Sequence, residues 1–233
     1  MLSQVIKFKG MALDLLFPRW CVGCGEEGNF ICVSCRRGLL PIKPPICPRC
    51  GHPQADEALC SSCASGQTAI DDIRSPFIFS GVMRQAIHQF KYRNLKALAT
   101  TLAELLLTYL EANPLPAEVL VPVPLHQTRL RERGYNQSEL LAKELGKMTE
   151  LPVLNECLIR ERYSLPQART ATAAERKKNV ENAFSCPGTS LESKRLLLID
   201  DVTTSGATLN AAATVLKEAG AISVWGLVVA REV

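Results

Sequence analysis

The stretch LLLIDDVTTSGATL, residues 196–209, decides the fold class predicted for this chain. Its consecutive apolar residues are typical of a buried strand, and the strand ends in two adjacent aspartates, Asp200 and Asp201. A hydroxyl-rich loop with one glycine, Gly206, follows, and the chain then takes on a helical pattern. A buried strand that leads through a polar loop into a helix is typical of an α/β fold.

The loop after this strand has the chemistry of a phosphate site. The start of a helix presents free N–H groups and the positive end of the helix dipole, and glycine lets the backbone approach an anion closely. The loop is not a P-loop, because the lysine of that motif is missing. Hydroxyl and backbone donors come from Thr203, Thr204, Ser205, Gly206, Ala207 and Thr208.

The two aspartates extend this site beyond a phosphate. Carboxylates accept hydrogen bonds from vicinal ribose hydroxyls, and they also suit Mg²⁺, which prefers oxygen ligands and phosphates. The alternative is a plain strand–turn–helix in which the aspartates cap the helix. The apolar run, the acidic pair and the Gly-x-Thr loop resemble the motif with which phosphoribosyltransferases bind phosphoribosyl pyrophosphate (PRPP). The resemblance implies that Asp200, Asp201 and the loop hold PRPP together with Mg²⁺.

Strand and helix patterns alternate from about residue 72 to residue 233. We expect strands over 73–79, 117–124, 154–163, 195–200 and 222–230, and helices over 82–92, 95–112, 136–148 and 207–220. Such alternation predicts a mostly parallel sheet flanked by helices, forming one domain over residues 72–233. Ligands of these sheets bind beyond the carboxyl ends of strands, which is where the loop after Asp201 lies.

Eight of the 10 cysteines lie between residues 21 and 63, in Cys-x-x-Cys pairs. The segment is an internal repeat, because each unit opens with Cys-x-x-Cys-Gly and ends with Cys-x-x-Cys. Four thiolates close a tetrahedral shell around Zn²⁺, so each unit predicts a structural zinc site. We expect a four-knuckle zinc module over residues 21–66, with two sites built from Cys21, Cys24, Cys32 and Cys35 and from Cys47, Cys50, Cys60 and Cys63.

Two questions about this module stay open in the sequence. The duplication favours this sequential pairing, but a cross-braced pairing would join the first knuckle to the third and the second to the fourth. Disulfides or an iron–sulfur cluster are alternatives to zinc. Cys157 and Cys186 stand apart, and we interpret them as ordinary small apolar residues.

A basic segment leaves the strand expected at residues 117–124. Arg129, Arg131 and Arg133 alternate along it and suit either pyrophosphate or a nucleic-acid backbone. The alternative is a solvated basic turn before a helix. A smaller cluster, Phe90 to Tyr92 with Arg93 and Lys96, suits contact with DNA, although we favour Phe90 in the core and the lysines in solvent.

Residues 160–184 form a second basic segment, and Pro166 with several small residues predicts a mobile loop there. The run PVPLHxxRLRxRGYNQ from Pro122, the later Pro-Gln, Glu-Arg and Asn-Ala-Phe pieces and the early LDLLFPxxCxxCG resemble the ComF family of competence and DNA-utilisation proteins. This resemblance covers nearly the whole chain. It implies a zinc module joined to a phosphoribosyltransferase-type core, with a flexible loop whose candidate site residues are Arg162, Gln167, Arg176 and Lys177.

The ComF resemblance implies a function in handling single-stranded DNA, for natural transformation or for use of DNA as a nutrient. Its expected partners are single-stranded DNA, PRPP or a related ribose phosphate, and a helicase or other DNA-uptake protein. The alternative is an active phosphoribosyltransferase that moves ribose 5-phosphate from PRPP to a nitrogenous base and releases pyrophosphate. The sequence assigns no catalytic residue, because no residue is an obvious reader of a base.

Composition sets wider limits. A net charge of +4 permits an anionic partner without requiring one, and 47% hydrophobic residues are enough for a real core. No apolar run reaches the roughly 18 residues that a membrane span needs. Residues 1–20 carry Lys7, Lys9 and Asp14 within an apolar pattern that lacks a cleavage site, so we expect an amphipathic helix there and a cytoplasmic location.

Overall fold

The structure is a computed structural model that describes residues 19–66, 68–162, 183–188 and 190–233. The amphipathic helix expected over residues 1–20 therefore lies outside the described residues, apart from its last two positions. Within the described ranges, no helix is both long enough and apolar enough to cross a membrane.

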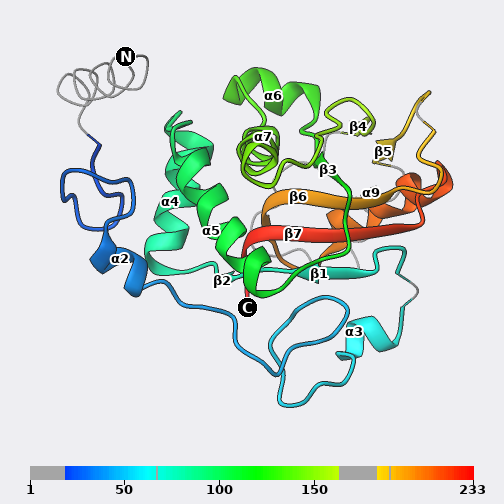
Figure 1. The fold of residues 1–233 in the computed structure, drawn as a ribbon, viewed down its shortest axis with the longest axis horizontal. Helices are drawn as coiled ribbons and strands as arrows, with labels where there is room; N and C mark the ends of the chain where they lie inside the picture. Colours follow the sequence, from blue (N-terminus) through cyan, green and yellow to red (C-terminus); the bar gives the residue numbers. More distant parts are fainter. Residues whose placement is uncertain (1–18, 67, 163–182, 189) are drawn as a thin grey trace.

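A parallel sheet forms the centre of the molecule (Figure 1). Its strand order is β1 (Asp72–Arg74), β7 (Ser223–Arg231), β6 (Arg195–Thr203) and β3 (Val119–Pro122), and β2 (Phe77–Ile78) pairs with β7 further along the same edge. β1 and β2 divide the strand expected over 73–79, because Pro76 has no N–H to donate to a sheet ladder. The prediction of a mostly parallel sheet flanked by helices is confirmed.

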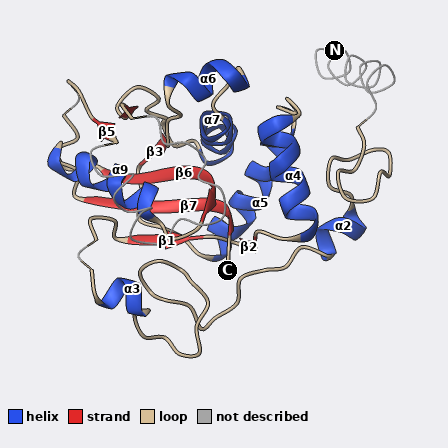
Figure 2. Cartoon of the chain, turned by 180° about the vertical axis from the view of Figure 1, so that it is seen from behind, coloured by secondary structure: helices blue, strands red, loops and turns tan. Residues whose placement is uncertain are grey.

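Helices cover both faces of this sheet (Figures 1 and 2). On one face, α4 (Gly81–Tyr92), α5 (Leu98–Ala112) and α7 (Gln137–Thr149) bury residues such as Phe90 and Leu102 against Leu197 and Leu227. On the other face, α9 (Ala207–Glu218) packs Leu209 and Leu216 against Leu198 and Val228. The alternation of apolar residues along β6 thus supplies both layers of the core.

Three local predictions need correction. β6 continues to Thr203, so both aspartates lie inside the strand rather than at its end. The strand expected over 154–163 is limited to β4 (Ile159–Arg160), which pairs antiparallel with β5 (Phe184–Ser185), outside the main sheet. The basic segment with Arg129, Arg131 and Arg133, where no helix was expected, forms α6 (Gln127–Arg133), with His126 as its N-cap and Gly134 in the left-handed conformation as its C-cap.

The two cysteine units pack against different parts of the domain. The first unit contains the short helix α2 (Val33–Arg37) and contributes Ile31 and Leu39 to the core around α4 and α5. The second unit contains α3 (Ser61–Ala64) and lies along β1, where the N–H of Ile73 donates to the carbonyl of Arg49 over 2.8 Å. The segment between the units pairs with β2, since Ile78 donates to the carbonyl of Leu40 over 2.9 Å.

Substitution of two equivalent glycines tests the packing of the second unit against β1. Gly25 and Gly51 occupy equivalent positions in the repeat, and both have a positive φ, 77° and 71°. A Cβ on Gly51 would lie 2.4 Å from the carbonyl oxygen of Ile73, whereas a Cβ on Gly25 would meet nothing within 4 Å. We expect Gly51→Ala to destabilise the protein by about 1–3 kcal/mol more than Gly25→Ala. Both substitutions strain a backbone with positive φ, but only the new methyl group at position 51 would also displace the backbone of β1. Urea unfolding measures this difference, and equal losses would contradict the packing described here.

Candidate ligand site and metal centres

The acidic pair of β6 lies at the carboxyl end of the sheet, with its two members in different surroundings. Asp201 is only 2% exposed, and its Oδ1 pairs with Nζ of Lys91 from α4 at 2.9 Å. Its second oxygen, Oδ2, is buried and has no hydrogen-bond partner among the described residues. A buried acceptor without a donor indicates a place for a ligand hydroxyl, a water molecule or a cation.

Asp200 accepts hydrogen bonds on Oδ1 from the Ser138 hydroxyl at 2.8 Å and from the N–H of Asp201 at 2.9 Å. Ser138 is held in place by Asn136, the N-cap of α7, whose side chain accepts from the N–H of Ser138 and donates to the carbonyl of Val123. Burial raises the pKa of Asp200 to about 7, and the neighbouring carboxylate of Asp201 adds to the rise. Asp200 therefore exchanges a proton near neutral pH.

Arg160 is a site residue that the sequence analysis did not single out. Its guanidinium lies over the ring of Phe184 at 5.4 Å, and its Nε is buried with no partner among the described residues. Burial lowers the pKa of Arg160, while the nearby carboxylate of Asp200 opposes this change and Arg129 reinforces it. Arg160 thus brings positive charge close to Asp200, and Arg129 lies near enough to Arg160 to oppose its charge. Pairing of β4 with β5 places Arg160 there, and no local sequence signal reports that pairing.

The predicted phosphate loop joins β6 to α9. Gly206 is the N-cap of α9, with a φ of 79°, and a Cβ there would lie 2.6 Å from Cδ1 of Ile73. Thr203 is buried, Thr204, Ala207 and Thr208 are partly buried, and Ser205 is exposed. The backbone N–H groups of Ser205 and Gly206 have no acceptor among the described residues. Free N–H groups at the start of a 12-residue helix suit an anion.

The three arginines of α6 do not form one surface. Along a helix, Arg129 and Arg133 lie one turn apart, whereas Arg131 points to a different side. Arg131 is exposed, and the guanidinium of Arg133 lies 5.4 Å from the ring centre of Tyr92 in α4.

The residues predicted for the flexible loop fall largely on chain that the structure does not describe. Arg162 is described and is exposed to solvent. Gln167, Arg176 and Lys177 lie outside the described residues. The described residues on either side of this segment belong to β4 and β5, which pair with each other, and Arg160 of β4 is close enough to Asp200 to feel its charge.

A cavity of about 620 Å³ opens beside the phosphate loop. It lies between the second cysteine unit and α9, and Phe184 lines it together with Ser205 and Gly206. Ile70, Ile73 and Val215 make part of the wall apolar, while Asn210 and Thr214 supply polar groups. Mixed walls of this kind suit a compact organic group with a few hydrogen-bonding atoms.

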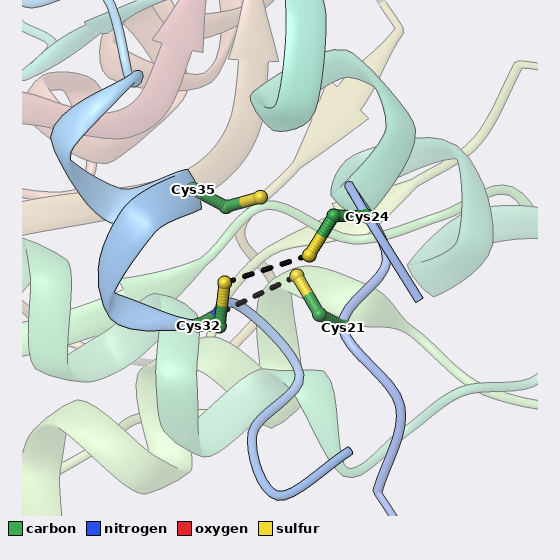
Figure 3. A group of neighbouring side chains, drawn as sticks. All are labelled: Cys21, Cys24, Cys32 and Cys35. Carbon is green, nitrogen blue, oxygen red and sulfur yellow. Dashed lines mark hydrogen bonds between the residues drawn. The ribbon is translucent and has the colours of Figure 1, made fainter. Parts of the chain in front are cut away.

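The eight knuckle cysteines form two sets of four. The Sγ atoms within each set lie within 4.8 Å of one another, and the sets are Cys21, Cys24, Cys32, Cys35 and Cys47, Cys50, Cys60, Cys63. Figure 3 shows the thiols of the first set turned toward a common centre. The predicted sequential pairing is confirmed, and the cross-braced alternative is wrong.

The donor chemistry of both sets fits Zn²⁺. The Cys24 and Cys32 sulfurs are 3.6 Å apart, well beyond the roughly 2.05 Å of a disulfide bond. In each set a backbone N–H points at a sulfur, from Cys32 to Cys21 at 3.4 Å and from Cys60 to Cys47 at 3.5 Å. Burial of the Cys47 thiol opposes ionisation, but hydrogen bonds from backbone N–H groups outweigh this and lower its pKa to about 6. The four sulfurs of each set lie close enough together to form the donor set of a closed tetrahedral zinc site.

Comparisons with known proteins agree with this arrangement. The double zinc ribbon domain family matches residues 12–64. Competence protein F of Haemophilus influenzae is 33% identical, over 85% of this chain and 96% of that protein. Competence protein ComFC of Bacillus subtilis is 33% identical, over 82% of this chain and 79% of its own length. DNA utilization protein YhgH of Escherichia coli is 31% identical, over 84% of this chain and 89% of that protein.

Similar solved structures overlap with just over half of the chain. A glutamine PRPP amidotransferase from B. subtilis, complexed with ADP and GMP, is 24% identical with a TM-score of 0.39. The overlap covers 57% of this chain and 26% of that one. A hypoxanthine phosphoribosyltransferase from Staphylococcus aureus is 14% identical with a TM-score of 0.34, over 57% of this chain and 62% of that one.

The raised pKa of Asp200 predicts a pH-dependent gain in stability for Asp200→Asn. A carboxyl whose pKa rises from 3.8 to about 7 on folding stabilises the fold when protonated, and this contribution is lost as the pH rises through that window. The amide of asparagine stays neutral, so the variant should exceed the parent by roughly 1–3 kcal/mol at pH 8 and converge with it near pH 4. Urea unfolding across this pH range measures the difference.

The matched control is Glu156→Gln, which neutralises an exposed carboxylate and should show little pH-dependent difference. A constant gap between Asp200→Asn and the parent from pH 4 to pH 8 would contradict the raised pKa of Asp200.

Proposed function

This chain belongs to the ComF family of competence and DNA-utilisation proteins, and we propose that it handles single-stranded DNA while binding PRPP or a related ribose phosphate. The two activities occupy different surfaces in this proposal. The sugar phosphate binds at the carboxyl end of β6, and DNA binds along α4 and α6. The proposed setting is the cytoplasmic side of DNA uptake, with a helicase or another uptake protein as partner.

The observation that carries the ribose-phosphate site is that backbone N–H groups without an acceptor and a carboxylate oxygen without a donor occur at the same edge of the sheet. The N–H groups of Ser205 and Gly206 suit the 5′-phosphate, and the carboxylates of Asp200 and Asp201 suit the ribose hydroxyls. The residues that would hold Mg²⁺ are the same two aspartates, whose oxygens suit that ion, and Mg²⁺ would neutralise charge on a bound pyrophosphate. Arg160 supplies further positive charge near Asp200.

The observation that supports DNA binding is an exposed ring surrounded by cations. Tyr92 is 63% exposed at the end of α4, and the ring of His88 lies 4.9 Å from it. Arg133 lies over the same ring, and Arg93 is exposed beside it. Proteins bind single strands by stacking bases on such rings while cations follow the phosphates. We call this group, Tyr92 with His88, Arg93 and Arg133, the Tyr92 surface.

One observation favours transferase activity as a second candidate function. The cavity between the second cysteine unit and α9 opens directly beside the phosphate loop, so it offers space for a nitrogenous acceptor. Release of pyrophosphate on incubation with PRPP, Mg²⁺ and a panel of bases, nucleosides and single-stranded DNA would support this candidate. Tight PRPP binding with no release for any acceptor would favour a binding function alone.

Asp200→Asn also tests the ribose-phosphate site. A hydrogen bond to a charged group contributes about 1.5–3 kcal/mol, so the variant should bind PRPP in the presence of Mg²⁺ about 10- to 100-fold more weakly. Titration calorimetry measures the affinity. Because the same substitution is expected to stabilise the fold at neutral pH, weaker binding cannot be ascribed to unfolding. Unchanged affinity relative to the parent and to Glu156→Gln would rule out Asp200 as a ligand contact.

Tyr92→Ala tests whether the Tyr92 surface binds DNA. Loss of one stacking platform costs about 1–3 kcal/mol, so affinity for a single-stranded oligonucleotide should fall about 5- to 150-fold. Tyr92→Phe keeps the ring and should retain most of the binding. Arg133→Gln should weaken binding and flatten its salt dependence, whereas Arg195→Gln, at an exposed arginine paired with Glu118, should do neither. Fluorescence anisotropy at several salt concentrations distinguishes these outcomes, and full binding by Tyr92→Ala would remove this surface from the proposal.

A further inference from the structure

Arg231 is the largest of the fully buried side chains among the described residues. It is 1% exposed and ends β7, where it lies opposite Thr203 of β6 in the parallel register. A buried guanidinium is strongly unfavourable unless hydrogen bonds and an opposite charge compensate for the lost water. The surroundings of Arg231 therefore have to supply both.

The hydrogen bonds of Arg231 join two segments that are far apart in the sequence. Its Nη1 donates to the carbonyl of Thr204, in the phosphate loop, over 2.7 Å. Its Nη2 donates to the carbonyl of Cys50, a member of the second cysteine set. One planar side chain thus connects the phosphate loop to a zinc ligand, a geometry that the two-pronged guanidinium allows.

The compensating charge comes from the second cysteine set. The bond from Nη2 to the carbonyl of Cys50 holds the guanidinium beside this set, whose thiolates are negatively charged. Four thiolates outweigh the two positive charges of a bound Zn²⁺, so the filled site stays negative. A filled site stabilises the buried cation, and by the same interaction the cation stabilises the filled site.

The bond to Thr204 also determines where the next N–H points. In a trans peptide the C=O and the following N–H point in opposite directions. When Arg231 holds the carbonyl of Thr204, the N–H of Ser205 is directed away from the guanidinium, and it has no acceptor among the described residues. Arg231 thereby keeps a donor of the phosphate loop available to an anion.

We propose that Arg231 is a positioning residue that couples the phosphate loop to the second zinc site, so that an anion at the loop and zinc at this site strengthen each other's binding. The first cysteine set is not connected in this way, because its unit packs on the layer of α4 and α5. The inference rests on the proposed function only in taking the loop as a phosphate site. The coupling is reciprocal by thermodynamic necessity.

The experiment measures zinc release into a coloured chelator, with and without PRPP and Mg²⁺. In the parent, PRPP should slow release of one of the two zinc ions about 10-fold and leave the other unchanged, within the usual range of such couplings. A Cys24→Ser variant, which disables the first set, identifies the slowed ion as that of the second. In Arg231→Lys, which keeps the charge and loses the two-pronged bridge, the slowing should disappear.

A second measurement needs no ligand. Hydrogen exchange of residues 203–210 should speed up about 10-fold in Arg231→Lys and Arg231→Gln, and Arg231→Gln should also lose its second zinc ion faster. Arg195→Gln, on the neighbouring strand β6, should leave exchange and zinc release unchanged. Folding of each variant is checked by exchange protection in α7, which packs mainly on α5, β3 and β6.

The outcomes separate the two proposals. If the parent fails to bind PRPP but exchange and zinc loss change as expected, the ribose-phosphate function fails and the structural coupling stands. If PRPP slows zinc release equally in the parent and in Arg231→Lys, or if exchange of 203–210 is unaffected in folded variants, Arg231 has no positioning function and the inference is overturned.

Discussion

Parallel pairing of β6 with β7 is the interaction on which the rest of the structure depends. The register sets Thr203 opposite Arg231 and brings the carboxyl ends of both strands to the same edge. That edge collects the acidic pair of β6, the phosphate loop and the buried guanidinium of Arg231. A parallel register also forces each connection to cross a face of the sheet, and the crossing after β6 is α9, whose first turn faces the loop.

The charged groups at this edge contribute little to net stability, although losing one partner of a pair is costly. A buried ion pair such as Lys91 with Asp201 gains attraction and loses water from both groups, so it often breaks even against an apolar pair. Removing only Lys91 would leave a carboxylate buried without its cation. The fold thus keeps buried charged groups that add little stability. Such groups are common at sites that bind a ligand.

Patterns confined to a short stretch could be predicted from the sequence. The spacing of the cysteines predicted both sets, and the periodicity of hydrophobic residues predicted the main strands and helices. Both kinds of pattern depend only on residues that are close together in the chain. Contacts between distant segments could not be predicted. Lys91 was expected in solvent, yet it pairs with Asp201, because only the packing of α4 on the sheet brings them together. Arg160 and Arg231 were missed for the same reason, since strand pairing places them and a single arginine carries no periodic signal.

The strands at the β1 edge are covered by the second cysteine unit and by the segment between the two units. The outward N–H of Ile73 is taken by the second unit, and that of Ile78 is taken by the intervening segment. An uncovered strand edge is a template for pairing with other chains, so covering it prevents association. The second cysteine unit and the segment before it therefore also protect the sheet from pairing with other chains. A chain shortened to residues 72–233 would expose β1 and β2 and tend to aggregate through them, even if its own core were complete.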